Sequence, residues 1–175
     1  MAVSDRSGLL RFVISISGRD AQQSLADWDG YQGSKDLVEV ETTTLDSFLS
    51  VIGRQLSPAF VKCDVEGAEV SVLDGSRMLL ASDSPPVVMF EINRKALRAQ
   101  GRSPGELMSM LRGYRMYFTP LDSNESTLQS LENVDHLPEL ANVFAFPERG
   151  DYAMRVASAK EFLGSRSEKA GPAFV

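Results

Sequence analysis

The sequence is poor in the side chains that form disulfides and soft-metal sites. Its 175 residues include one cysteine, Cys63, and one histidine, His136. A single cysteine excludes an internal disulfide and fits a reducing compartment, so we expect a cytoplasmic protein. With one cysteine and one histidine, the chain cannot form a zinc site from several Cys and His ligands, and a Cys/His nucleophile pair is also excluded. We therefore predict no metal site. His136 lies in a polar segment, where we expect a solvent-exposed side chain.

Long apolar runs and excess positive charge are also missing. The longest apolar runs have the length of a strand, far short of the roughly 20 residues that span a bilayer. Arg11, Ser15 and Ser17 interrupt the first run, so we expect no signal peptide. The net charge is −6 and the basic residues are scattered, which disfavours nucleic acid as a partner. With 43% hydrophobic residues, the chain can bury the core of one domain.

Strand and helix patterns alternate along the chain, which predicts an α/β fold. The segments 12–17 and 38–42 alternate apolar with polar side chains, and we expect them to pair as a hairpin. The apolar run 87–92 is typical of a central strand covered on both faces. A helix over 44–56 is expected to pack on the sheet. Further strands are predicted at 59–65, 114–118 and 142–146, and further helices at 67–81, 103–113 and 153–163.

The segment FVKCDVEGAEVSVL (60–73) places three carboxylates and a glycine between a strand and a helix. Ligands of open α/β sheets bind outside the carboxyl ends of the strands. Asp64 could orient or deprotonate an acceptor hydroxyl there, with Glu66 and Glu69 lining the same opening. The structural alternative is that acidic residues offset the helix dipole and Asp64 caps the helix. The position of Asp64 at the strand end favours a functional role for it. For Glu66 the functional and the structural interpretations both stay open, and for Glu69 the structural one is favoured.

Glu91 interrupts an apolar strand, where an unpaired charge is unfavourable. Two interpretations stay open: a role in the same crevice, or an ion pair with Lys62 on the neighbouring strand. Asn93 follows as a hydrogen-bonding residue for a substrate. The predicted site therefore has Asp64, Glu66 and Glu91 as catalytic residues and Glu69 and Asn93 as substrate-binding residues.

Five segments, in order, resemble the C-terminal half of the FkbM-type S-adenosylmethionine-dependent methyltransferases. The most specific is KCDVEGAE, and FEIN is the second. The resemblance implies a three-layer Rossmann-like sheet with a terminal antiparallel strand pair, and methyl transfer from S-adenosylmethionine to a hydroxyl of a sugar or secondary metabolite. The segments are VEVETTTLDSFL (38–49), PAFVKCDVEGAEVSVLDGSRMLL (58–80), PPVVMFEIN (85–93), ELMSMLRGYRMYF (106–118) and ANVFAFP (141–147).

The family's glycine-rich turn, which holds the methyl donor, has no counterpart among residues 1–36, because no two glycines there have G-x-G spacing. The donor-binding residues are therefore unknown. We divide a single, N-terminally truncated domain into a divergent strand and polar loop (1–36), a family-like core (37–147) and a C-terminal helix and tail (148–175).

A missing first strand would leave the strand that ends at Asp64 with an open edge. Residues 9–16, a second copy of the chain or a partner subunit could cover it. One alternative to an enzyme is thus a non-catalytic truncated domain that lacks the donor site. A second alternative is a magnesium-dependent phosphohydrolase, because Asp64-Val65-Glu66-Gly67 is loosely similar to a D-x-D-G loop.

Overall fold

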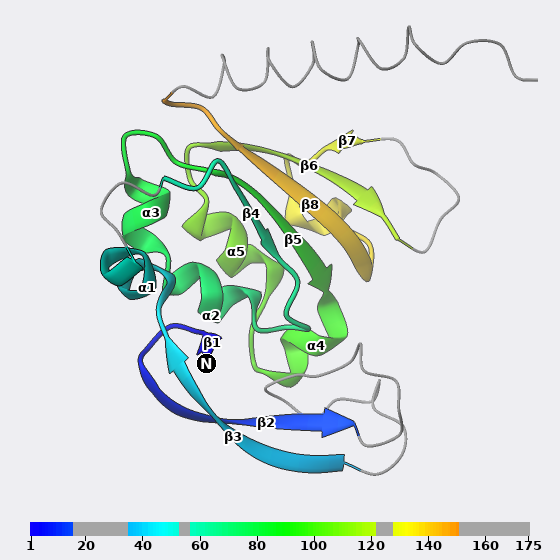
Figure 1. The fold of residues 1–175 in the computed structure, drawn as a ribbon. Helices are drawn as coiled ribbons and strands as arrows, with labels where there is room; N and C mark the ends of the chain where they lie inside the picture. The colour runs from blue at the N-terminus through cyan, green and yellow to red at the C-terminus, as the bar shows by residue number, and fades with distance from the viewer. Residues whose placement is uncertain (16–34, 53–56, 122–127, 151–175) are drawn as a thin grey trace, which may run out of the picture.

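The computed structural model describes residues 1–15, 35–52, 57–121 and 128–150 and has an α/β fold with two open sheets (Figure 1). The smaller sheet has the order β1-β3-β2, and the main sheet has the order β4-β5-β8-β6-β7. The α/β class is confirmed, but a single three-layer Rossmann-like sheet is not. The helix predicted at 153–163 lies outside the described residues.

The smaller sheet contains the predicted hairpin. β2 (Gly8–Ser15) pairs antiparallel with β3 (Lys35–Thr43), and β1 (Ala2–Val3) pairs parallel with β3 on its other side. The buried Thr42 donates its hydroxyl proton within this sheet, with the carbonyl oxygens of Arg6 and Gly8 both within 3.2 Å. Figure 1 shows the hairpin lying beyond the end of the main sheet toward which β4 and β5 point.

The main sheet is mixed. β4 (Phe60–Cys63) and β5 (Val87–Asn93) are parallel, whereas β8 (Leu140–Pro147) is antiparallel to both β5 and β6 (Tyr114–Pro120). This confirms the predicted antiparallel pair, and the short β7 (Gln129–Ser130) extends the sheet beyond β6. β4 forms the other edge. β2 does not pair with it and belongs to the separate sheet.

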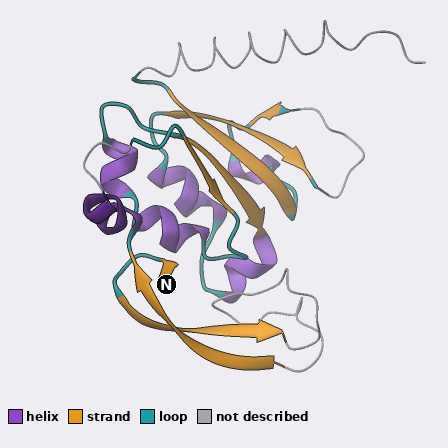
Figure 2. Ribbon diagram, in the orientation of Figure 1, coloured by secondary structure: helices purple, strands orange, loops and turns teal. Residues whose placement is uncertain are grey.

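One face of the main sheet carries the core. The helices α2 (Glu69–Asp74), α3 (Arg77–Ala81) and α5 (Pro104–Met110) pack on it (Figure 2). Residues of β5 and β8 are alternately buried and half-exposed. The expectation that β5 is covered on both faces is therefore wrong for the described residues. The strand is central, but only Val88, Phe90 and Ile92 are fully buried.

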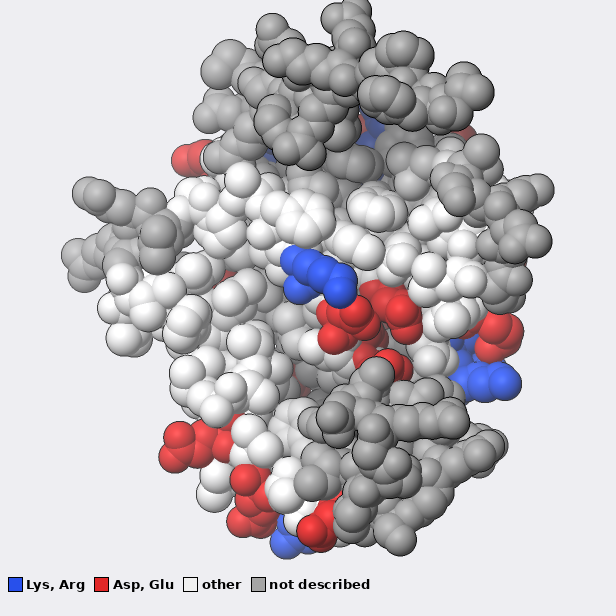
Figure 3. Space-filling view, turned by 45° about the vertical axis from the view of Figure 1, so that its right-hand side comes forward, with Lys and Arg blue, Asp and Glu red and all other residues white. Residues whose placement is uncertain are grey.

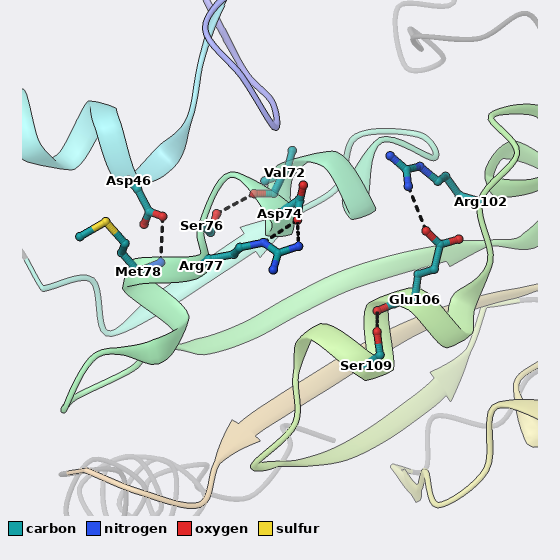
Figure 4. Close-up of polar contacts among 9 residues, drawn as sticks. All are labelled: Asp46, Val72, Asp74, Ser76, Arg77, Met78, Arg102, Glu106 and Ser109. Carbon is teal, nitrogen blue, oxygen red and sulfur yellow. Dashed lines mark hydrogen bonds and ion pairs between the residues drawn. The ribbon is translucent and has the colours of Figure 1, made fainter.

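The single helix predicted over 67–81 is two helices with a break at Gly75 and Ser76. The Ser76 hydroxyl donates to the carbonyl oxygen of Val72 at 2.6 Å, and Asp46 accepts the first free N–H groups of α3, from Met78 at 2.8 Å and Leu79 at 3.0 Å (Figure 4). Because a distant carboxylate caps α3, the second helix starts afresh. The buried side chains of the two helices include Leu73 and Leu80.

The remaining helices differ in how their ends are capped. α1 (Leu45–Ile52) is capped by Thr44, whose hydroxyl oxygen accepts the N–H of Ser47 at 3.0 Å. It has no fully buried residue, and it contacts α3. Packing of this helix on the sheet stays a prediction. α5 begins with a capping box formed by Ser103 and Glu106, and Gly113, which follows this helix, has a φ of 84°. α4 (Arg94–Ala99) and the 3-10 helix η1 (Val134–His136) complete the described helices, and His136 is exposed.

Gly75 provides a test of how β1 and α1 are fastened to the core. A Cβ atom at this position would lie 2.1 Å from the carbonyl oxygen of Ser4. We expect Gly75→Ala to lower the free energy of unfolding by roughly 1–3 kcal/mol, because a backbone atom would have to move. Urea denaturation measures this. Gly105→Ala is the control, since its nearest contact would be 3.8 Å away and alanine favours a helix. Equal stability of the two variants would contradict the packing.

Candidate functional site

The site begins where β4 ends. Lys62 and Asp64 project from the half-exposed face of the strand, and the lysine Nζ donates to Asp64 Oδ2 at 2.8 Å. The predicted alternative of a Lys62–Glu91 ion pair is therefore not what forms. Asp64 does not cap α2 either, because the N-cap position of that helix is Ala68. The Asp64 carboxylate is 41% exposed, so it is accessible to a ligand.

A tight turn follows Asp64. The N–H of Ala68 donates to the carbonyl oxygen of Val65 at 3.3 Å, and the two residues between them, Glu66 and Gly67, have φ values of 52° and 97°. Glu66 is the one non-glycine residue with positive φ in the described part of the chain. A Cβ atom on Gly67 would lie 2.9 Å from Ala96 in α4. Glycine is thus required here both by conformation and by close packing.

Glu69 lies beneath this turn rather than in the opening. It is 1% exposed, and its Oε1 accepts the N–H groups of Val65 and Gly67, each at 3.2 Å. Its Oε2 is buried without a hydrogen-bond partner. Burial is the main reason that the pKa of Glu69 is raised to about 7, and nearby Glu91 raises it further. Its predicted contact with substrate stays a prediction.

Glu91 and Asn93 come from β5, on the same half-exposed face of the sheet as Lys62. Asn93 is the N-cap residue of α4, because its side-chain oxygen accepts the N–H of Ala96 at 3.2 Å. Its donor group is not part of that bond, so a substrate contact for Asn93 stays a prediction. The charges of Asp64, Glu66 and Glu91 act on one another, and their catalytic roles stay predictions.

The electrostatics show how close the three carboxylates are. Burial raises the pKa of Glu66 to about 6, and Glu91 and Asp64 add to the rise. Burial and Asp64 likewise raise the pKa of Glu91, while Lys62 opposes the shift. Figure 3 shows acidic side chains gathered against a single basic one near the middle of the face that it presents. A carboxylate with a pKa near 6 can accept a proton at neutral pH and still release it.

A cavity of about 460 Å³ lies beside this cluster, between β4 and the smaller sheet. Its walls are mostly apolar, with Lys62 and Asp64 as the polar groups. Volumes of this size are usual for small-molecule sites. The apolar lining comes from both sheets and from two helices: Ala2, Val3, Phe12, Leu45, Val61, Cys63, Val65, Ala68 and Val72.

In open α/β sheets, ligands bind outside the carboxyl ends of parallel strands, which is where these carboxylates and the cavity lie. The model of the Methyltransferase FkbM domain matches residues 2–116 of the chain, and the chain therefore belongs to the FkbM methyltransferase family. The match includes KCDVEGAE and also residues before position 37, and it ends within β6. No curated protein and no solved structure matches the chain.

Family membership supports a methyltransferase and does not favour a non-catalytic truncated domain over it. Two further findings bear on the excluded classes. No helix in the described residues is long and apolar enough to cross a membrane. Within the same residues, no three His, Cys, Asp or Glu side chains are grouped so that they could hold a metal ion.

The far wall of the cavity could not be predicted from the sequence. Phe12 and Leu45 lie about 50 and 20 residues before Asp64 in the chain, yet line the same space. Neither carries a polar group or a motif that marks a site. Only the packing of β2 and α1 near β4 brings them there, and no local pattern in the sequence specifies that packing.

The buried Glu69 predicts a pH dependence of stability. Its pKa rises from 4.5 to about 7 on folding, so the folded state holds a proton that the unfolded state releases as pH rises through this range. Stability from this group is complete below about pH 4.5 and is lost by about pH 7, a change on the order of 3 kcal/mol. Glu69→Gln removes the titration, so it should match the wild type near pH 4 and exceed it near pH 8.

Urea denaturation at a series of pH values measures this difference. Glu132→Gln, at an exposed position, is the control and should keep the wild-type pH dependence. A Glu69→Gln variant whose stability parallels the wild type at every pH would show that Glu69 is charged in the folded protein.

Proposed function

We propose that this chain is an S-adenosylmethionine-dependent O-methyltransferase, whose acceptor is a hydroxyl of a sugar or secondary metabolite. The observation that carries the proposal is the group of Asp64, Glu66 and Glu91, whose charges act on one another, together with a cavity that both sheets line and to which Asp64 contributes. Family membership supports methyl transfer, and the choice of a hydroxyl acceptor rests on the carboxylates available to take its proton.

The cavity fits the adenosyl part of a methyl donor. Apolar side chains such as Val65 and Phe12 suit a purine ring, and the Asp64 carboxylate suits the hydroxyl or amine groups of the donor. When bound, the donor supplies a methyl group made electrophilic by its sulfonium. Family membership implies the donor, whereas the assignment to this cavity is our proposal.

The chain's own residues then have separate tasks. Glu66 accepts the proton of the acceptor hydroxyl, since its pKa of about 6 leaves it largely ionised at neutral pH. Burial, and after it the neighbouring carboxylates of Glu91 and Asp64, keep the pKa of Glu66 above its ordinary value. Positioning of the two reactants supplies much of the rate, because methyl transfer requires an in-line approach.

Donor binding is tested by calorimetric titration with S-adenosylhomocysteine, which occupies the donor site without reacting. We expect the wild type to bind and Leu45→Trp to bind at least about tenfold more weakly, because the larger ring fills the cavity. Leu49→Trp is the matched control, one turn further along α1 and not part of the lining. Equal affinity of Leu45→Trp and the wild type would place the donor elsewhere.

Proton transfer is tested with isotope-labelled methyl donor and a panel of sugar and secondary-metabolite hydroxyl acceptors. We expect kcat/KM to rise with pH through about 6, because Glu66 acts in its ionised form. Glu66→Gln should lower kcat by roughly 10²–10⁴-fold while leaving S-adenosylhomocysteine affinity near the wild-type value. Glu132→Gln serves again as the surface control. An unchanged pH profile in Glu66→Gln would assign the base to another group.

A further inference from the structure

The turn at the end of β4 has an unusual residue at its first central position. A four-residue turn whose two central residues both have positive φ normally uses Gly, Asn or Asp at those positions. Here the first is Glu66, at φ 52°, and the second is Gly67, at φ 97°. Strained residues of this kind persist only where the surrounding structure holds them, and they are concentrated at functional sites.

The structure contains two contacts that hold the turn. On one side, Gly67 packs so closely against Ala96 and Gln100 that no side chain fits. On the other side, a single carboxylate oxygen, Oε1 of Glu69, accepts the N–H groups of Val65 and Gly67, each at 3.2 Å. The N–H of Gly67 lies on the peptide unit directly after Glu66, and the N–H of Val65 lies on the peptide unit between Asp64 and Val65. Glu69 therefore holds the backbone at Val65 and at Gly67, one residue to either side of the strained Glu66.

The environment of Glu69 suits a neutral acceptor. The residue is 1% exposed, and its second oxygen, Oε2, has no hydrogen-bond partner. In the described part of the chain, the titratable groups coupled to Glu69 include Glu91 and the buried thiol of Cys63, and neither brings a positive charge. A proton on Oε2 would remove the buried charge and leave Oε1 free to accept both N–H groups.

We propose that Glu69 is a positioning residue, whose buried carboxyl holds Glu66 in its left-handed conformation and so sets where the Glu66 carboxylate meets Asp64 and Glu91. This contact role differs from the substrate binding predicted for Glu69 from the sequence. The effect on catalysis rests on the proposed function, in which Glu66 is the base. The effect on the geometry of the turn does not, because that geometry can be measured without donor or acceptor.

The first test needs no variant. In a pH titration of the isotope-labelled chain followed by NMR, the amide protons of Val65 and Gly67 should shift in step with the side-chain carboxyl carbon of Glu69. Hydrogen bonding to a titrating acceptor produces that correlation. Amide shifts that follow Asp64 or Glu91 instead, or that do not titrate, would overturn the proposal.

The second test compares Glu69→Gln with Glu69→Leu. Glutamine keeps an acceptor oxygen and mimics the protonated acid, whereas leucine keeps only the bulk. We expect the Val65 and Gly67 amides to exchange with solvent at least about tenfold faster in Glu69→Leu, and to remain within about threefold of the wild type in Glu69→Gln. The pKa of Glu66 should move toward its ordinary value in the leucine variant alone. Exchange of the Phe90 amide, in the centre of β5, is the internal control.

The kinetic consequence separates positioning from stability. Glu69→Leu should lower kcat more than it changes KM, and Glu69→Gln should restore most of the rate. Unchanged exchange at Val65 and Gly67 in Glu69→Leu would overturn the proposal, as would equal loss of protection in both variants. Failure of methyl transfer in the wild type would count against the proposed function and leave both NMR results interpretable.

Discussion

The parallel pairing of β4 with β5 is the interaction on which the site depends. Its register joins Cys63 to Phe90, and continued by one residue it brings Asp64 beside Glu91. Parallel strands end at the same edge of a sheet, so the turn after β4 and the polar end of β5 share one opening. The remaining strands pair antiparallel and extend the sheet away from this edge. The helices on one face then anchor the pair through Val88, Phe90 and Ile92.

Gathering like charges at this edge opposes folding, and the chain offsets it in two ways. Lys62 neutralises part of the charge through its ion pair with Asp64. Burial also raises the pKa values of Glu66, Glu69 and Glu91, so that each group keeps its proton up to a higher pH in the folded protein than in the unfolded chain; for the fully buried Glu69 the pKa is about 7. Several carboxyl groups with raised pKa values at one edge of a sheet are typical of a functional site.

Local patterns predicted the elements better than their arrangement. The hairpin, the capping box at Ser103 and the grouping of Asp64, Glu66 and Glu91 all follow from short-range signals. The break at Gly75 could not be predicted, because the group that caps α3 is Asp46, in another helix. Nor could the burial of Glu69, since helical periodicity places it in a first turn that is usually solvated. The separate smaller sheet is likewise a property of long-range packing, which no window of the sequence specifies.

The capping of α3 by Asp46 has a consequence for ligand affinity. Asp46 follows Leu45, which forms part of the cavity wall, and α1 buries none of its residues completely. That wall is therefore attached to the core through a few polar contacts instead of a large apolar interface. Local detachment of α1 requires far less free energy than global unfolding. A molecule that binds the cavity only when α1 is attached to the core must also stabilise that attachment. Occupancy of the cavity and order in α1 are therefore thermodynamically linked and rise together.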